Sequence, residues 1–142
     1  MECKRLLFCT GQVYAALVKQ RAASGVDDVA IARIEQLHPF PWAQIRDELQ
    51  KYPNLEEIIW TQEEPLNAGA WTFVQPRLET ILRQTENHSA KHVKYAGRAP
   101  SASVATGMKS THLVSAYKVC RILGRFSNNP NRKKNKHWST ML

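Results

Sequence analysis

The sequence is poor in cysteine and glycine and contains no long apolar run. Its 142 residues include three Cys and six Gly. Cys3, Cys9 and Cys120 form no Cys-x-x-Cys pair, so neither a disulfide framework nor a zinc ribbon is predicted, and a reducing compartment is expected. No stretch reaches the roughly 18 apolar residues that span a bilayer, and the start, MECKRLLFCTG, has too short an apolar run for a signal or targeting peptide. We therefore expect one soluble, unsecreted globular domain with no membrane partner.

Acidic residues are missing from the end of the chain, and this locates the net charge of +8. Residues 1–113 carry 13 basic and 12 acidic side chains, a balance of +1, whereas residues 114–142 carry seven basic and none acidic, a balance of +7. Polar and basic composition of this kind is typical of disorder. The sequence predicts an α/β domain over 1–113, a segment over 114–126 that can form a helix, and a basic, disordered tail over 127–142.

Short apolar runs alternate with helical patterns over the first 113 residues. The predicted strands cover residues 5–9, 29–34, 57–61 and 93–96. Helical periodicity follows each of the first three strands, with one helix ending near Ser24, one starting after Pro41 and one burying Val74, Leu78, Ile81 and Leu82. This order is typical of an α/β fold around a mainly parallel sheet.

Three finer expectations follow from the same patterns. The run from Val29 to Ile34 is nearly all apolar, which indicates a strand buried on both faces. Trp42 belongs to a helical stripe and Trp60 to a strand, so both are expected in the core rather than in a base-stacking platform. Pro76 is expected to kink or restart its helix.

Two pairs of polar residues have patterns that also occur in catalytic or metal sites. Glu63 and Glu64 are adjacent at the end of a strand, where side chains alternate between faces, so a structural role is favoured over shared acid–base chemistry. His88 and His92 have the spacing of a helical metal site, but a loop with a solvated pair is favoured because no third ligand lies nearby. The lone glycine of the CTGQVY turn, Gly11, does not make a dinucleotide fingerprint.

Two loops carry candidate contact residues. Ser101, Ser103 and Thr106 lie in a small-residue loop without a G-x-S-x-G elbow, so the hydroxyls are expected to cap backbone amides and pack the loop, although an anion could use the same amides. Trp71 follows a Gly-Ala pair in the other loop, where an aromatic side chain often anchors an interface between subunits or domains.

Several long strings together resemble one family. They are LFCTGQVYAAL (7–17), IEQLHPFPW (34–42), LQKYPN (49–54), QEEPLNAGAW (62–71), GRAPSASVATG (97–107) and KSTHL (109–113). In this order they resemble the C-terminal domain of 2-oxoglutarate dehydrogenase, the thiamine-dependent, decarboxylating first component of its complex.

The resemblance implies a transketolase-like three-layer sandwich and a part in the oxidative decarboxylation of 2-oxoglutarate in the mitochondrial matrix, with succinyl transfer to lipoamide, in the tricarboxylic acid cycle. It places thiamine diphosphate and magnesium on upstream domains, so no catalytic, cofactor-binding or metal residue is assigned here, and the chain is expected to be inactive alone. The implied partners are the remaining domains, a second subunit and the other components of the complex. The implied interface residues are Glu63, Glu64, Asn67, Trp71, Arg98, Ser101 and Ser103.

The resemblance stops after Leu113, where an acidic, apolar closing helix is expected and a basic segment stands instead. We therefore expect a truncated or misspliced product or a gene-model fragment. The alternative is a stand-alone binding module that associates with the full-length dehydrogenase or with anionic partners through the RKKNK segment (132–136). Nucleic acid is not expected as a partner of the folded domain, because its charge is nearly balanced.

Overall fold

A computed structural model describes residues 2–104 of the chain. The elements in chain order are β1 (Arg5–Cys9), α1 (Val13–Ser24), β2 (Val29–Arg33), α2 (Trp42–Gln50), β3 (Glu57–Pro65), α3 (Trp71–Arg83), a 3-10 turn η1 (Glu86–His88) and β4 (Val93–Arg98). The predictions for the 114–126 segment, the basic tail and Thr106 lie outside the described residues.

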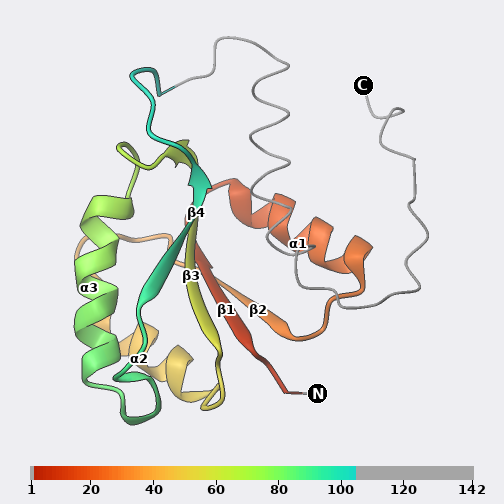
Figure 1. Cartoon of the computed structure of the whole chain (residues 1–142), viewed down its shortest axis with the longest axis vertical. Helices are drawn as coiled ribbons and strands as arrows, with labels where there is room; N and C mark the ends of the chain where they lie inside the picture. The colour runs from red at the N-terminus through yellow and green to blue at the C-terminus, as the bar shows by residue number, and fades with distance from the viewer. Residues whose placement is uncertain (1, 105–142) are drawn as a thin grey trace.

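The four strands form one parallel sheet in the order β2-β1-β3-β4. Helix α1 lies on one face, and α2 and α3 lie together on the other (Figure 1). Each of the first three strands is followed by a connection that contains a helix and returns the chain to the amino ends of the strands, as a parallel arrangement requires. The predicted α/β class and three-layer arrangement are confirmed.

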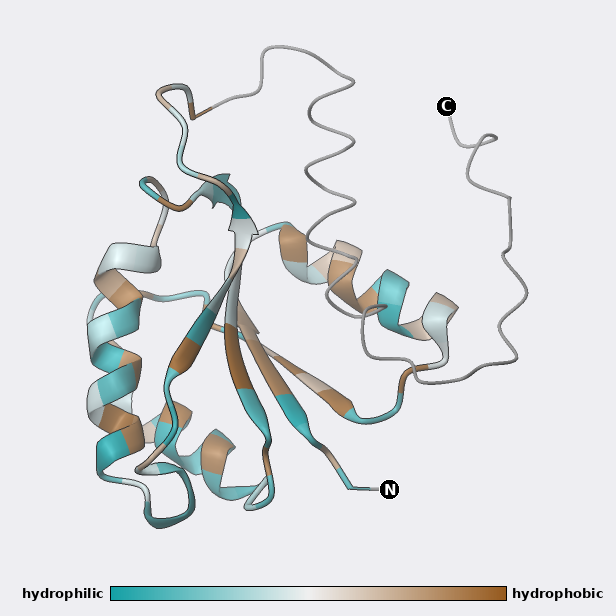
Figure 2. Ribbon diagram, in the orientation of Figure 1, coloured by the Kyte–Doolittle hydropathy of each residue, from teal (hydrophilic) through white to brown (hydrophobic). Residues whose placement is uncertain are grey.

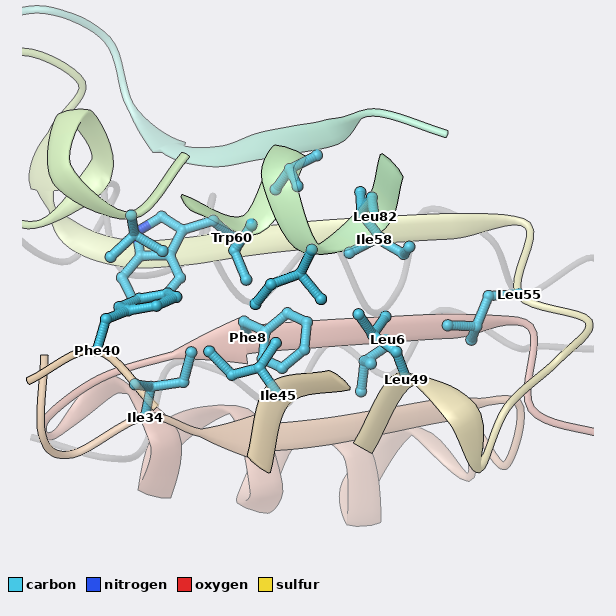
Figure 3. Close-up of a cluster of buried hydrophobic side chains, with 14 residues drawn as sticks. Leu6, Phe8, Ile34, Phe40, Ile45, Leu49, Leu55, Ile58, Trp60 and Leu82 are labelled. Carbon is cyan, nitrogen blue, oxygen red and sulfur yellow. The ribbon is translucent and has the colours of Figure 1, made fainter. Parts of the chain in front are cut away.

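The core consists of two apolar clusters, one on each face of the sheet. The larger one joins β1 and β3 to α2 and α3, with Trp60 fully buried beside Phe40 (Figure 3). The smaller one joins the sheet to α1 through Val13 and Leu17. Hydropathy follows this arrangement, because the middle of each central strand is hydrophobic and the amino ends of β1 and β3 are hydrophilic (Figure 2).

Helix boundaries follow from local chemistry that the sequence already contains. α1 ends at Gly25, whose φ of 58° lies in the left-handed region that a residue with Cβ enters only at a cost. The predicted stripe of α3 is confirmed, since Val74, Leu78, Ile81 and Leu82 are all buried. α3 continues as one helix across Pro76, so no new helix begins there. Packing of the stripe on both sides of the proline stabilises the continuous helix.

Two burial predictions were wrong. Among residues 2–104, β2 lies at the edge of the sheet with a neighbouring strand on one side, and Val29 is its one buried residue. Trp42 is 46% exposed. Phe40 takes the core position beside Trp60, and Trp42 packs edge-to-face against Phe40 with ring centroids 5.0 Å apart.

The histidine pair also differs from its prediction. His92 is exposed, as expected, and its Nδ1 lies 3.2 Å from Glu79. His88 is buried, and its Nε2 lies 3.2 Å from the carbonyl oxygen of Leu49, at the end of α2. A carbonyl only accepts, so Nε2 carries the proton. His88 therefore ties η1 to a helix 39 residues away, a contact that spacing along the chain does not reveal.

Over residues 2–104, no helix is both long enough and apolar enough to cross a membrane.

Candidate interface at the carboxyl edge of the sheet

The two loops singled out in the sequence leave the same edge of the sheet. β3 and β4 are parallel neighbours, and Pro65 pairs in register with Arg98. The β3–α3 loop (66–70) and the segment after β4 (99–104) therefore start side by side at the carboxyl ends of these strands (Figure 1). The carboxyl edge of an open parallel sheet is where such folds place their functional loops. We call residues 62–71 and 95–104 the carboxyl-edge surface.

A reciprocal pair of hydrogen bonds joins Asn67 to Ser101. The Asn67 side-chain amide donates to the Ser101 carbonyl at 2.9 Å, and the Ser101 backbone N–H donates to Asn67 Oδ1 at 2.9 Å. The backbone N–H of Leu66 adds a bond to the Arg98 carbonyl at 3.1 Å. The Asn67 side chain thus pairs with the Ser101 backbone in the way that a neighbouring strand would. The structure brings together two predicted residues that are 34 positions apart in the sequence.

Gln62, in β3, was not predicted as a site residue, and its side chain makes hydrogen bonds that hold the β3–α3 loop in place. Its side chain is buried, and its Oε1 accepts from the Trp60 indole N–H at 2.9 Å and from the Trp71 backbone N–H at 3.0 Å. Its Nε2 lies 2.7 Å from the Ala68 carbonyl and 3.1 Å from the Pro65 carbonyl. A polar residue that continues an apolar strand run, IIWTQ, is the signal that could have pointed to it.

Tyr95 connects the loop to β4. Its hydroxyl lies 3.1 Å from the carbonyls of both Glu64 and Arg98. Its ring packs against Trp71 with centroids 5.2 Å apart. Burial raises the pKa of the Tyr95 hydroxyl, and the nearby Gln62 side chain opposes this in part, so the group stays a neutral donor at physiological pH.

Two glycines make this close packing possible. A Cβ on Gly97 would lie 2.3 Å from the Tyr95 hydroxyl oxygen. Gly69 has a φ of 67°, and a Cβ there would lie 2.9 Å from Gln62 Nε2. Both values are far inside van der Waals contact, so these positions require glycine for space, and Gly69 requires it for conformation as well.

The remaining predicted residues occupy different environments on the same surface. Trp71 is the first residue of α3 rather than a loop residue, and it is half-buried. Glu63 is exposed and Glu64 half-buried, so the two carboxylates do not share one environment. Arg98 Nη1 donates to the Val104 carbonyl at 2.7 Å. The Ser103 backbone N–H donates to Ser101 Oγ at 3.2 Å, the amide capping that was predicted for this loop.

This arrangement fixes the shape of two loops rather than assembling reactive groups. Residues 66–70 and 99–104 contain no charged side chain, in a chain that is 23% charged. Across residues 2–104, no three His, Cys, Asp or Glu side chains gather where they could hold a metal ion. These two loops offer mostly small, uncharged side chains and backbone groups, which suits close contact with another protein surface.

Comparison with known proteins identifies the family. The family model "2-oxoglutarate dehydrogenase C-terminal" matches residues 1–122. The chain belongs to the 2-oxoglutarate dehydrogenase C-terminal family. The match ends within the 114–126 segment that the sequence analysis set apart from the domain.

Relatives in this family are much longer proteins. The chain is 55% identical over 112 residues to "2-oxoglutarate dehydrogenase, mitochondrial" of Saccharomyces cerevisiae, an alignment that covers 79% of this chain and 11% of the relative. It is 54% identical over 110 residues to the protein of that name in Schizosaccharomyces pombe, covering 78% and 11%. It is 46% identical over 112 residues to "2-oxoglutarate dehydrogenase E1 component" of Brucella anthropi, covering 78% and 11%. The chain thus spans about a tenth of the length of these relatives.

A solved structure shares the fold. It is titled "Split gene transketolase, inactive beta4 tetramer", with a TM-score of 0.57, 9% identity, and coverage of 88% of this chain and 38% of that one. At this identity the likeness concerns the fold, and it confirms the transketolase-like architecture that the resemblance implied.

Proposed function

We propose that the chain supplies the C-terminal structural domain of a 2-oxoglutarate dehydrogenase, docks on the rest of that enzyme through the carboxyl-edge surface, and is inactive alone. The family match over residues 1–122 carries the proposal. The reaction served is the oxidative decarboxylation of 2-oxoglutarate with succinyl transfer to lipoamide, because the relatives of known name are 2-oxoglutarate dehydrogenases.

The composition and geometry of the surface support docking. Its two loops are uncharged, and Asn67 and Ser101 already satisfy each other's backbone and amide groups. A surface whose polar groups are paired internally loses little on desolvation when another protein covers it. Glu63 at its margin is exposed and offers a charge to the polar rim of such an interface.

The thiamine diphosphate and magnesium of the full-length family fit poorly on the carboxyl-edge loops. Magnesium that accompanies a diphosphate is held by one or two carboxylates and by phosphate oxygens, and residues 66–70 and 99–104 contain no carboxylate side chain. We assign both groups to the rest of the enzyme. We also propose the mitochondrial matrix as the location of the chain, following the names of its mitochondrial relatives, and a second subunit and the other components of the complex as its partners.

A reconstitution experiment tests this proposal. The Saccharomyces cerevisiae enzyme is prepared without the segment that matches this chain, and the 142-residue chain is added. The chain is expected to bind the shortened enzyme and to raise its consumption of 2-oxoglutarate. No binding would contradict the proposal, as would turnover of 2-oxoglutarate by the chain alone with thiamine diphosphate and magnesium.

A matched pair of charge reversals locates the contact. Glu63→Arg changes an exposed residue of the carboxyl-edge surface, and Glu86→Arg makes the same change at an exposed residue of η1, which precedes β4. Glu63→Arg is expected to weaken binding about tenfold, the effect of about 1.4 kcal/mol at an interface rim. Equal binding by the two variants would show that docking uses another face.

The charge division of the sequence supports one other function. Residues 114–142 carry all but one unit of the net charge, +7 of +8, so a binding module that contacts anionic partners through the RKKNK segment is the second candidate. Its affinity for DNA or anionic vesicles is expected to fall steeply between low and moderate salt and to vanish on removal of residues 127–142. Docking on the shortened dehydrogenase is expected to survive both changes.

A further inference from the structure

The Gln62 side chain, in β3, affects more of the carboxyl-edge surface than the neighbouring β3–α3 loop. Its carboxamide faces five partners, which are the Trp60 indole, the Trp71 backbone N–H and the carbonyls of Glu64, Pro65 and Ala68. The amide nitrogen has two hydrogens, and the two shorter contacts, to Ala68 and Pro65, take them. The Glu64 carbonyl, at 3.4 Å, is left as an acceptor for another donor.

That other donor is the Tyr95 hydroxyl of the neighbouring strand. It lies 3.1 Å from the Glu64 carbonyl in β3 and 3.1 Å from the Arg98 carbonyl at the end of β4. Arg98 in turn accepts from the Leu66 N–H of the β3–α3 loop. Gln62 therefore reaches the start of the 99–104 segment through Pro65, whose neighbour Leu66 donates to the Arg98 carbonyl. The single Tyr95 hydroxyl hydrogen, shared between the Glu64 and Arg98 carbonyls, supports the same connection from β4.

We infer that Gln62 is a positioning residue that couples the β3–α3 loop to the segment after β4, so that both open and close as one unit and dock as one preformed surface. The inference rests on the proposed function for its docking half. Coupling follows because each loop closes the other's hydrogen bonds: Asn67 pairs with Ser101, and both loops depend on carbonyls that Gln62 and Tyr95 hold in place. A preformed surface loses less conformational freedom on binding than two loops that order separately.

Gln62→Glu keeps the hydrogen bonds that the Gln62 side chain accepts and removes those that it donates. A carboxylate of the same shape still accepts from the Trp60 indole and the Trp71 N–H. It no longer donates to the Ala68 and Pro65 carbonyls, and its negative charge is repelled by their partly negative oxygens. Gln44→Glu, the same change on the exposed side of α2, is the matched control. Tyr95→Phe removes only the hydroxyl that links the strands and serves as the second variant if Gln62→Glu does not fold.

Amide hydrogen exchange on the full 142-residue chain tests the coupling. The reporters are the N–H groups of Leu66 and Ser101, one in each loop, with Ile59 in the core strand as the internal reference. Gln62→Glu and Tyr95→Phe are each expected to speed exchange at both loop reporters by about tenfold while Ile59 is unchanged. Acceleration at Leu66 alone, or at neither reporter, would overturn the inference.

Docking on the shortened dehydrogenase tests the other half and separates it from the proposed function. If the native chain binds, Gln62→Glu is expected to bind about tenfold more weakly and Gln44→Glu equally well. Equal binding by Gln62→Glu would overturn the positioning role. If the native chain fails to bind, the proposed function is wrong, whereas joint acceleration of the two loop reporters would still establish the coupled unit.

Discussion

The two edges of the sheet are held together by different chemistry. At the amino edge, charged pairs dominate: Arg5 contacts Asp28 with two bonds of 2.9 Å, Lys4 lies 2.8 Å from Glu56, and Lys94 lies 2.5 Å from Glu57. At the carboxyl ends of β3 and β4, neutral amides, a phenol and backbone carbonyls make most of the contacts, together with the Arg98 guanidinium. An ion pair at this side of the sheet, Arg33 with Glu35, lies at the end of β2. The Lys4–Glu56 and Lys94–Glu57 pairs are exposed and add little stability, whereas neutral, internally paired groups suit an edge that another protein covers.

The reactivity of two cysteines offers the largest contrast between the edges. Burial raises the pKa of the Cys9 thiol, at the carboxyl end of β1, to about 12, while Cys3, before the amino end, is partly exposed. At pH 8 the Cys9 thiolate fraction is on the order of one in ten thousand, so alkylation by iodoacetamide is expected to be about a thousandfold slower than for an ordinary exposed thiol.

The raised pKa of Cys9 also makes the stability of the fold depend on pH. Because the folded state favours the protonated thiol, Cys9 contributes stability below the unfolded pKa near 9, and this contribution is lost as pH rises toward 12. Peptide mapping after timed labelling separates the cysteines. Equal labelling of Cys3 and Cys9 in the folded chain would show that the carboxyl edge admits water.

Removing the ion pair of Arg5 with Asp28 is expected to destabilise the fold at the amino edge. The Arg5 side chain is 5% exposed and pairs with Asp28, which is 34% exposed. Asp28→Ala withdraws the carboxylate from a buried guanidinium and is expected to lower the free energy of unfolding by about 2 kcal/mol. Asp27→Ala, at the exposed neighbouring position, is the control and is expected to change it by less than about 0.5 kcal/mol. Urea denaturation measures both, and equal effects would contradict a special role for the pair.

Adding one methyl group at Gly97 is expected to destabilise the fold at the carboxyl edge. Gly97→Ala places Cβ 2.3 Å from the Tyr95 hydroxyl and 3.1 Å from the Gln62 carbonyl, so the free energy of unfolding is expected to fall by about 2 kcal/mol. Gly25→Ala has open space around it and a φ of 58°, so it tests conformation alone, with an expected loss of about 1 kcal/mol. A smaller loss at Gly97 than at Gly25 in chemical denaturation would show that Tyr95 moves aside freely.

Removing an exposed charge has the smallest expected effect. Lys94→Met deletes the ion pair with Glu57, in which the lysine side chain is 63% exposed. A loss of about 0.5 kcal/mol is expected at low salt, and it should shrink further in about 1 M NaCl because salt screens exposed pairs. Lys19→Met on α1 is the control. A loss that persists in high salt would indicate that the pair acts through packing.

The local elements could be predicted because their signals lie within a few residues. The apolar run RLLFC is β1 as predicted, and the spacing of Val74, Leu78, Ile81 and Leu82 marks the buried face of α3. Gly25 ends α1 through its own backbone freedom. β3 was predicted to end at Thr61 but extends to Pro65, because its last residues pair with β4, whose position the pattern does not contain.

The candidate surface could be predicted only in part. The QEEPLNAGAW and GRAPSASVATG strings identify the two loops, and the structure places them at one edge. Their internal contacts were not predictable. Gln62 faces a loop up to nine residues away and Tyr95 a strand 31 residues away, and Ser101 meets Asn67 across two strands. Such partners depend on which strands become neighbours.

The sequence by itself determined the α/β class, the three helices, most of the core, the division of charge and the family. The first four depend on composition or on residues a turn or two apart, and the family depends on the order of conspicuous strings along residues 7–113. The tertiary structure alone decided that β2 lies at an edge, that Trp42 stays exposed, that His88 is buried against α2 and that Gln62 and Tyr95 join two loops. These depend on strand order and on contacts between distant residues, and periodicity along a single chain carries no record of either.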